Sequence, residues 1–320
     1  DVAPSRGLGD VYKRQALGIS LVGGLIGCNT KTSDNEQDNT QTITVSHRGG
    51  ETEVSKNPKN VVVLDYGSLD ILNEMGVDSV SALPKKSLPD YLNEYNDEKY
   101  TDLGSVKEFN LEAVNELNPD LIIIEGRQAD SYDEFSKIAP TIYLGSDGAN
   151  YLETLKNNVT VLGQIFDKED VAKEKIEEIE NRMNSIKEKV KADNLNALMT
   201  MVSDGSMSVY GEGSRFNIIY NELGFMSADS SIEISNHGQS ISNEYLVSKN
   251  PDYLFVIDKG AMTGGENQPA KEIIENELVK TTDTYKNGNI VYLDPQTWYV
   301  GGAGIKAANE MLNEVEEALK

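Results

Sequence analysis

The longest regular pattern of apolar and polar residues lies between residues 167 and 191. The stretch contains neither Gly nor Pro, and Asp167 is suited to cap its start. At 1.5 Å per residue, a helix of this length would measure ~37 Å, about the width of a domain. We interpret it as a rigid helix connecting two lobes, with an ordinary amphipathic surface helix as the alternative. The apolar residues recur close to the 3.6-residue helical period, at Val171, Ile176, Ile179, Met183, Ile186 and Val190.

Short apolar runs alternate with helical patterns before this stretch. Residues 43–54 predict a hairpin that turns at Arg48-Gly49-Gly50. Strands are expected at residues 61–65, 79–82, 121–125 and 141–144. Helices are expected at residues 68–75, 110–117, 132–138 and 151–165. The alternation predicts an α/β lobe with a mostly parallel sheet over residues 42–150.

The alternation begins again after the long helix. Strands are expected at residues 197–202, 253–258 and 290–293, and helices at residues 216–223, 242–249, 272–278 and 306–319. Residues 195–320 therefore form a second α/β lobe, and residues 151–194 are the connecting helices. The predicted fold is two Rossmann-like lobes with mostly parallel central sheets, joined by one long interdomain α-helix.

Two short sequences recur in the same order in both halves. Asn-Glu-Met-Gly at 73–76 corresponds to Asn-Glu-Leu-Gly at 221–224. Glu112 and Glu244 each lie seven residues before the Pro of an Asn-Pro-Asp turn, and an apolar strand follows each turn. Each copy by itself is a common helix–turn–strand pattern, but two copies in matching order predict two lobes of similar construction.

The start of the chain predicts a lipid anchor. Residues 16–27 are apolar, follow Lys13 and Arg14, and are too few to span a bilayer. They end in Leu-Ile-Gly-Cys at 25–28, which resembles the bacterial lipobox and implies lipidation of Cys28. Residues 28–41 are polar and predict a flexible tether. Residues 1–15 do not resemble a signal sequence, and we interpret them as a cloning or assembly remnant that precedes the signal-peptide core.

Composition narrows the classes of ligand and partner. The chain has 320 residues, enough for two domains, and 38% hydrophobic with 26% charged residues is typical of a soluble globular protein. A net charge of −24 argues against nucleic acids and anionic membrane surfaces as partners, so the predicted membrane contact is the lipid alone. An anionic ligand would need a locally basic pocket. The single Cys excludes an internal disulfide.

The predicted arrangement resembles the class III, helical-backbone binding proteins of ABC importers for iron-siderophores, haem and cobalamin. It shares with them a lipid anchor, a tether, two α/β lobes and a connecting helix. Four local sequences, at residues 62–67, 214–216, 235–242 and 293–299, are similar to the branch that binds ferric catecholate siderophores of the petrobactin type. The resemblance implies a monomeric, extracytoplasmic lipoprotein that carries an Fe(III)–siderophore complex to a permease dimer. It implies no cofactor and no catalysis. Haem or cobalamin binding in the same fold is the alternative.

Three basic residues are candidates for binding such a complex. A ferric catecholate is anionic with flat aromatic faces, so cations with several donors and aromatic rings suit it. Arg127 follows the strand at 121–125, and Lys259 follows the strand at 253–258, where α/β sheets place ligand groups. Arg215 follows Gly-Glu-Gly at 211–213. The family commonly has Arg at the position of Lys259, and Lys lacks the planar fork of donors.

The resemblance also implies that His237 and Tyr299 can bind the iron itself when the siderophore leaves two coordination positions open. Imidazole and phenolate are both suitable Fe(III) donors. Trp298 is an alternative to Tyr299 as the ring that faces the ligand, and Tyr66 and Lys85 are further pocket candidates. Glu112 and Glu244 are either ordinary acids at helix starts or, as in the family, contacts for the two permease subunits.

Two other classes of protein fit the sequence poorly. It contains no Gly-x-Ser-x-Gly elbow, no P-loop, no Gly-x-Gly-x-x-Gly after the first strand and no His-Glu-x-x-His, so an enzyme is not expected. A resident zinc or manganese site would need about three His with a carboxylate. The chain has two His.

Overall fold

The computed structural model describes residues 41–235, 237–262 and 269–320. The predicted leader at 1–27, the lipidation site Cys28 and all of the tether except residue 41 lie outside the described residues. Among the helices that are described, none combines the length and the apolar run that crossing a membrane requires.

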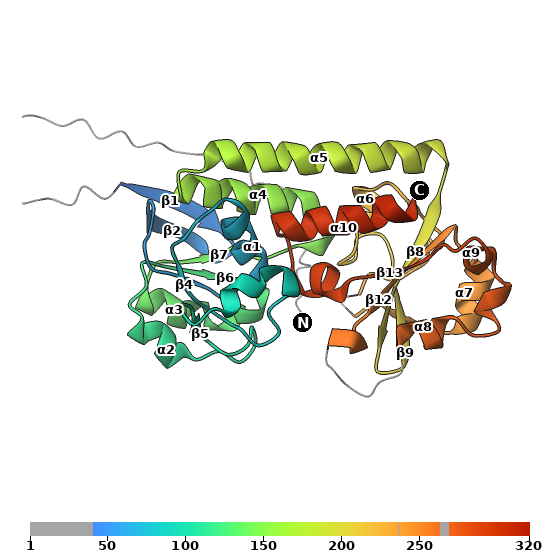
Figure 1. The fold of residues 1–320 in the computed structure, drawn as a ribbon, viewed down its shortest axis with the longest axis horizontal. Coiled ribbons are helices and arrows are strands. Elements are labelled where there is room, and N and C mark those ends of the chain that lie inside the picture. The colour runs from blue at the N-terminus through green and yellow to red at the C-terminus, as the bar shows by residue number, and fades with distance from the viewer. Residues whose placement is uncertain (1–40, 236, 263–268) are drawn as a thin grey trace, which may run out of the picture. The chain divides into compact units, whose positions relative to one another are not determined.

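The first lobe is built on a parallel sheet, as its alternating pattern predicts (Figure 1). The predicted hairpin is β1 (Thr42–His47) and β2 (Gly50–Ser55), paired antiparallel with Thr42 opposite Ser55. The sheet has the order β5-β4-β3-β6-β7. Its strands are β3 (Val61–Val63), β4 (Val80–Leu83), β5 (Thr101–Asp102), β6 (Leu121–Ile124) and β7 (Thr141–Tyr143). All of β6 is buried, as is usual for a central parallel strand.

Helices and 3-10 turns connect these strands and cover the sheet. They are α1 (Tyr66–Glu74), η2 (Asp90–Asn96), α2 (Leu111–Glu116), η3 (Gly126–Ser131), α3 (Tyr132–Ile138) and η4 (Gly148–Asn150). The sequence does not indicate η2 or β5, because neither has an apolar period. Asp65 and Asn110 cap α1 and α2 by accepting backbone amides, so local chemistry fixes where these helices begin.

The second lobe has a mixed sheet of order β11-β9-β8-β12-β13, with β10 also paired to β8. Neighbours β8, β12 and β13 are parallel, whereas β9 is antiparallel to both β8 and β11. The strands are β8 (Asn196–Ser203), β9 (Ser206–Tyr210), β10 (Met226–Ser227), β11 (Gln239–Ile241), β12 (Tyr253–Asp258) and β13 (Ile290–Leu293). Strand β9 was not predicted, although Asp204-Gly205, both with positive φ, forms the two-residue turn before it.

The helices of this lobe are mostly shorter than predicted. They are α6 (Ile218–Asn221), α7 (Asn243–Lys249), α8 (Ala270–Ile274) and α9 (Asp283–Lys286), with 3-10 turns η5 (Gly260–Met262) and η6 (Val279–Thr281). A π-helical turn, η7 (Gln296–Val300), follows β13. The helix predicted at 272–278 begins earlier and ends at Ile274, beyond which the chain turns through η6.

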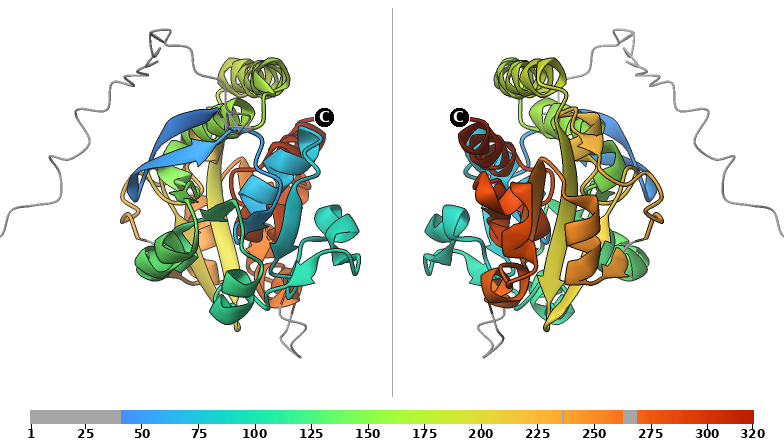
Figure 2. Two further views of the ribbon diagram at one scale, coloured as in Figure 1. Left: turned by 90° about the vertical axis from the view of Figure 1, so that its left-hand side faces the viewer. Right: turned by 90° about the vertical axis from the view of Figure 1, so that its right-hand side faces the viewer.

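The long connecting helix exists as α5 (Glu169–Ala192), which lies along α4 (Tyr151–Ile165) and extends between the lobes (Figures 1 and 2). Its buried face includes Ile179, Met183, Ile186 and Val190, as the period predicts. The expected cap is wrong. Asp167 has φ 51° in the turn between the helices, and its carboxylate instead contacts Lys56 and Asn57, while Lys168 takes the cap position.

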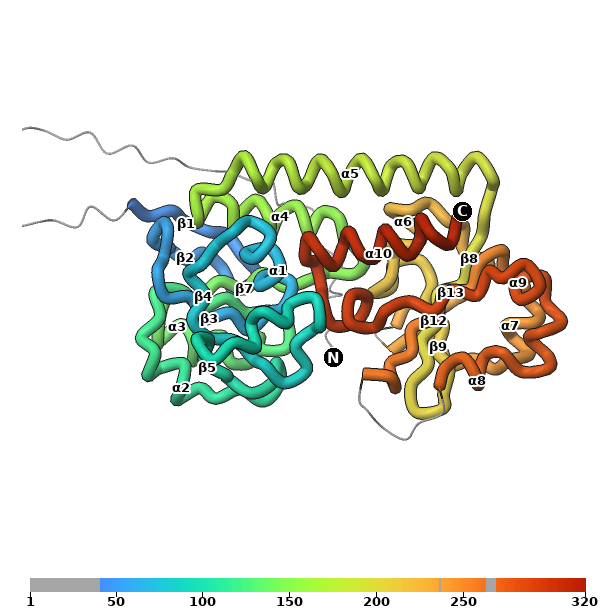
Figure 3. The backbone as a smooth tube through the Cα atoms, in the orientation of Figure 1, coloured from blue at the N-terminus to red at the C-terminus, as the bar shows by residue number. Residues whose placement is uncertain are grey.

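A second helix also bridges the lobes, which the sequence analysis does not anticipate. Helix α10 (Ile305–Ala318) follows the second sheet in sequence, yet it packs against both α5 and α1 (Figure 3). Arg182 of α5 donates to Glu316 of α10 at 3.0 Å. One cluster of buried side chains runs from the first sheet through these helices into the second. The lobes therefore share a core.

Candidate functional site

Three of the residues predicted to bind the ligand come together in the second lobe. The guanidinium carbon of Arg215 lies 4.3 Å from the centre of the Tyr299 ring, and the Lys259 ammonium lies 5.4 Å from it. Arg215 also donates from Nη2 to the backbone oxygen of Tyr299 at 3.4 Å. Two cations on one phenol ring form a positively charged aromatic surface, which we call the basic cluster (Arg215, Lys259 and Tyr299).

The fold brings these residues together from three places in the chain. Lys259 directly follows β12, and Tyr299 lies in η7 just after the parallel neighbour β13, so both are at the carboxyl end of the sheet. Arg215 follows Gly213, whose φ of 76° favours glycine in the turn that leads towards α6. Ligand groups gather at this end because the loops there diverge from adjacent parallel strands.

The charges of the basic cluster alter the acidity of the phenol. Burial by itself would raise the pKa of Tyr299, but the positive charges of Arg215 and Lys259 outweigh burial and hold that pKa below its ordinary value. No carboxylate lies within ion-pair distance of Arg215 or Lys259 among residues 41–235, 237–262 and 269–320. An anionic ligand would meet uncompensated positive charge here.

The first lobe touches the segment that carries Arg215. A Cβ atom on Gly148 of η4 would lie 2.0 Å from the backbone oxygen of Arg215, so only glycine fits there. The Asn217 side chain donates to the backbone oxygen of Ala149 at 2.8 Å. Residues 148–149 belong to the first lobe, so this segment lies where the two lobes meet.

Arg127 is in a different electrostatic setting. It lies in η3, directly after β6, and Nη1 donates to Glu125 Oε1 at 2.9 Å. Glu125 is only 8% exposed. Burial raises the pKa of Glu125, although the positive charge of Arg127 works against that rise. Glu125 was not predicted as a site residue, although a carboxylate two residues before a candidate binding Arg can be recognised in the sequence.

Two of the predicted pocket residues, Trp298 and Tyr66, lie in the core of the structure. Trp298 is 6% exposed and its indole N–H donates to Glu314, so Tyr299 and not Trp298 is the ring beside the cations. Tyr66 is 1% exposed, and its hydroxyl donates to the backbone oxygens of Pro84 and Lys86. The polar group of each side chain has a hydrogen-bond partner inside the protein.

Lys85 lies beside η2, and His237 lies in the turn before β11. The Lys85 ammonium donates to the backbone oxygens of Asn96 and Asp97, at 3.3 and 2.8 Å. It closes the end of η2. His237 is exposed in the turn before β11, and its backbone N–H donates to Ser235 Oγ. Its neighbour Gly238 packs on the Tyr210 ring, so the His237 turn adjoins residues that border the basic cluster.

Glu112 and Glu244 occupy matching places in the two lobes. Each is exposed in the first turn of its helix, α2 or α7. A hydrogen bond from Ser242 lowers the pKa of Glu244, which remains ionised at neutral pH. Both carboxylates are thus available to a partner on the surface, in agreement with the repeat found in the sequence.

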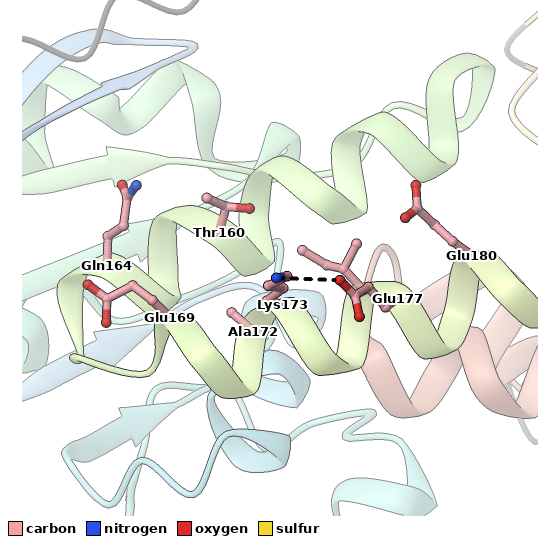
Figure 4. Close-up of a pocket in the computed structure, with 8 residues that line it drawn as sticks. Thr160, Gln164, Glu169, Ala172, Lys173, Glu177 and Glu180 are labelled. Atoms are coloured by element: carbon pink, nitrogen blue, oxygen red, sulfur yellow. Dashed lines mark ion pairs between the residues drawn. The ribbon is translucent and has the colours of Figure 1, made fainter.

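Two other kinds of site were considered as places for a ligand, a cluster of metal-binding side chains and a surface groove. Within the described residues, no three His, Cys, Asp or Glu side chains converge as a metal site would require. A groove of about 340 Å³ lies between α4 and α5, lined by Glu169, Glu177 and Glu180 among others (Figure 4). Lys173 on its wall pairs with Glu177 at 3.8 Å. Its lining includes no residue of the basic cluster, and its acidic wall would repel an anionic ligand.

Comparisons with known proteins agree with the fold. Residues 61–297 match the family described as periplasmic binding protein. Petrobactin-binding protein YclQ of Bacillus subtilis is 44% identical, over 95% of this chain and 97% of its own length. Ferric-anguibactin-binding protein FatB of Vibrio anguillarum is 31% identical, over 91% and 92%.

Solved structures give the same result. The crystal structure of YclQ superposes with a TM-score of 0.84 at 46% identity, covering 88% of this chain and 99% of that one. The periplasmic catecholate-siderophore binding protein VctP of Vibrio cholerae has a TM-score of 0.81 at 35% identity, covering 87% and 100%.

Proposed function

The chain belongs to the periplasmic binding protein family, and we propose that it binds a ferric catecholate siderophore of the petrobactin type between its lobes and delivers it to an ABC importer. Its relatives are substrate-binding proteins, and we propose that this chain likewise has no catalytic role and acts as a monomer without a cofactor. The Fe(III) complex is its cargo.

The observation that carries this proposal is the basic cluster. A ferric catecholate presents negative charge and flat aromatic faces, and the cluster offers two cations around one ring at the place where the lobes meet. We propose that Arg127 contributes a third cation from the first lobe. Lys259 keeps the charge of the Arg that the family commonly has, but it binds as a single point of charge.

We further propose that Tyr299 and His237 complete the coordination of iron when the siderophore supplies only four donor atoms. The pKa of Tyr299 is held below its ordinary value, which supports this role because the phenolate is the form that binds iron. His237 is exposed and lies in a turn next to Tyr210, so a change in that turn could bring its imidazole to the site. Lys85 remains a predicted contact at the edge of the pocket.

The proposed route of delivery involves the N-terminal residues and one exposed Glu on each lobe. We propose that residues 1–27 precede a lipidated Cys28, that 28–41 tether the protein, and that the lipid holds it at the extracytoplasmic face of the cell membrane. We propose that residues 42–150 and 195–320 act as the two lobes around the connecting residues 151–194. Glu112 and Glu244, one on each lobe, would contact the two permease subunits.

Ligand titration tests the proposal. Trp298 is the single Trp and adjoins Tyr299, so its fluorescence should fall as ferric petrobactin is added to the purified protein. Haemin and cobalamin, added in parallel, should leave the fluorescence unchanged after correction for their own absorbance. Binding of haemin or cobalamin with no response to ferric petrobactin would contradict the proposal and favour the other ligands of this fold.

A further inference from the structure

Tyr210, at the end of β9, carries a buried hydroxyl without a partner. The residue is 1% exposed, and its hydroxyl oxygen has no hydrogen-bond partner among the described residues. Most buried polar groups in native proteins are paired, so such a hydroxyl calls for an explanation. Ser214, directly before Arg215, carries another unpaired buried hydroxyl in the same segment of chain.

The Tyr210 ring borders the basic cluster. It packs edge-on against Phe216 with 4.9 Å between the ring centres, and the Arg215 guanidinium lies 5.1 Å from the same Phe216 ring. The charges of Arg215 and Tyr299 are both close enough to act on the Tyr210 hydroxyl. The unpaired hydroxyl therefore belongs to the environment of the basic cluster.

The turn that contains His237 covers the hydroxyl end of the ring. A Cβ atom on Gly238 would lie 2.9 Å from Tyr210 Cζ, the carbon that bears the hydroxyl, and φ at Gly238 is 73°. Only glycine allows this close approach. The hydroxyl would become accessible if Gly238 moved away from the ring.

We propose that the Tyr210 hydroxyl is a further ligand-binding group of this site, and that it donates a hydrogen bond to an anionic oxygen of the ferric complex held at Arg215 and Tyr299. This proposal rests on the proposed function. Burial raises the pKa of Tyr210 to about 12, although Arg215 acts to lower it. The hydroxyl consequently stays protonated at neutral pH and can only donate to a ligand that brings negative charge.

Tyr210→Phe removes the hydroxyl and keeps the ring. We expect the affinity for ferric petrobactin to fall about tenfold, which corresponds to ~1.4 kcal/mol. The melting temperature of the ligand-free protein should stay the same or rise, because the change removes an unpaired buried hydroxyl. A purely structural tyrosine would not show this division between affinity and stability.

Tyr220→Phe is the matched control. Tyr220 is also buried in the second lobe, but its hydroxyl is paired: it donates to the backbone oxygen of Tyr210 at 2.8 Å and accepts from Met199 N at 3.1 Å. Its loss should lower the melting temperature and leave affinity unchanged. Unchanged affinity in Tyr210→Phe, or equal affinity losses in both variants, would overturn the proposal.

A second chelate identifies the oxygen. If the acceptor is a catecholate oxygen, Tyr210→Phe should weaken the binding of a ferric bis-catecholamide without a carboxylate as much as the binding of ferric petrobactin. If only the binding of ferric petrobactin is weakened, the acceptor is a carboxylate of that ligand. If the unmodified protein binds neither chelate, the proposed function fails and the role of Tyr210 with it. If every variant binds both chelates normally, the proposed role of Tyr210 is contradicted and the proposed function is not.

Discussion

The two lobes contribute cations to the candidate site in different ways. In the first lobe, Arg127 is paired with the buried carboxylate of Glu125. In the second lobe, Arg215 and Lys259 face the Tyr299 ring, with no acidic partner in ion-pair distance within the described residues. Arg127 and Lys259 both follow strands of their sheets, yet within the described residues only Arg127 has a carboxylate partner.

The difference teaches that position after a strand does not determine how much charge a residue offers a ligand. A carboxylate at hydrogen-bond distance offsets much of the electric field of a cation, because the potentials of the two opposite charges largely cancel at greater distances. The second lobe should therefore provide most of the attraction for an anionic complex. Arg127 should mainly orient the complex and stabilise its own lobe.

The largest expected effect follows from this contrast. Truncating one partner of a desolvated charge contact typically costs about 2–5 kcal/mol. Arg215→Ala should therefore weaken ferric petrobactin binding by at least tenfold, since 1.4 kcal/mol is a factor of ten. Arg127→Ala should weaken it less. Fluorescence titration of both variants under identical salt conditions would measure the two losses.

For the stability of the protein, we expect the order of the two variants to be reversed. Arg127→Ala leaves Glu125 buried without its cation, so it should destabilise the protein more than Arg215→Ala does. Denaturant melts give both free energies of unfolding. Equal losses of affinity together with equal losses of stability would mean that the two lobes do not differ in the way their charges imply.

A smaller effect concerns Asp70, which joins α1 to the start of α10 by hydrogen bonds. Asp70 of α1 is 0% exposed, and its carboxylate accepts the backbone N–H groups of Lys306 and Ala307 at the start of α10, at 3.0 and 2.9 Å. Burial raises the pKa of Asp70 to about 7, although these two hydrogen bonds work against the rise. The folded state then holds a proton that the unfolded chain has released.

The sign of the pH dependence follows. A raised pKa in the folded state stabilises the protein at low pH, and this stabilisation is lost as pH rises towards 7. Between pH 5 and 7 the loss should be about 2 kcal/mol. Asp70→Asn cannot titrate, so its free energy of unfolding should fall less over that interval. Parallel slopes for the two proteins would place the Asp70 pKa near its ordinary value.

The smallest effect tests the basic cluster without any ligand. Because Arg215 and Lys259 lower the pKa of Tyr299, one tyrosine should ionise before the others in an ultraviolet titration. That early step should disappear in Tyr299→Phe and move to higher pH in Arg215→Ala. Tyr132→Phe, in α3 of the first lobe, should leave the early ionisation step unchanged. An early step that persists in Tyr299→Phe belongs to another residue.

Much of this protein could be read from its sequence. The apolar period of residues 167–191 predicted α5, because helix propensity and amphipathic spacing are local properties. The paired Asn-Pro-Asp turns predicted two similar lobes and placed Glu112 and Glu244 at matching helix starts. The strand pattern also showed that Arg127 and Lys259 follow strands, at the end where α/β sheets place ligand groups.

Only the tertiary structure decided what depends on residues distant in the chain. Tyr299 and Trp298 are neighbours in sequence, and the π-helical winding of η7 sends one towards Arg215 and buries the other against Glu314. Helix α10 packs against α1, where Asp70, over two hundred residues earlier in the chain, accepts backbone N–H groups from its first turn. Local patterns specify elements and their exposed faces. Which faces meet, and which charges are compensated, depends on packing between elements that no local pattern encodes.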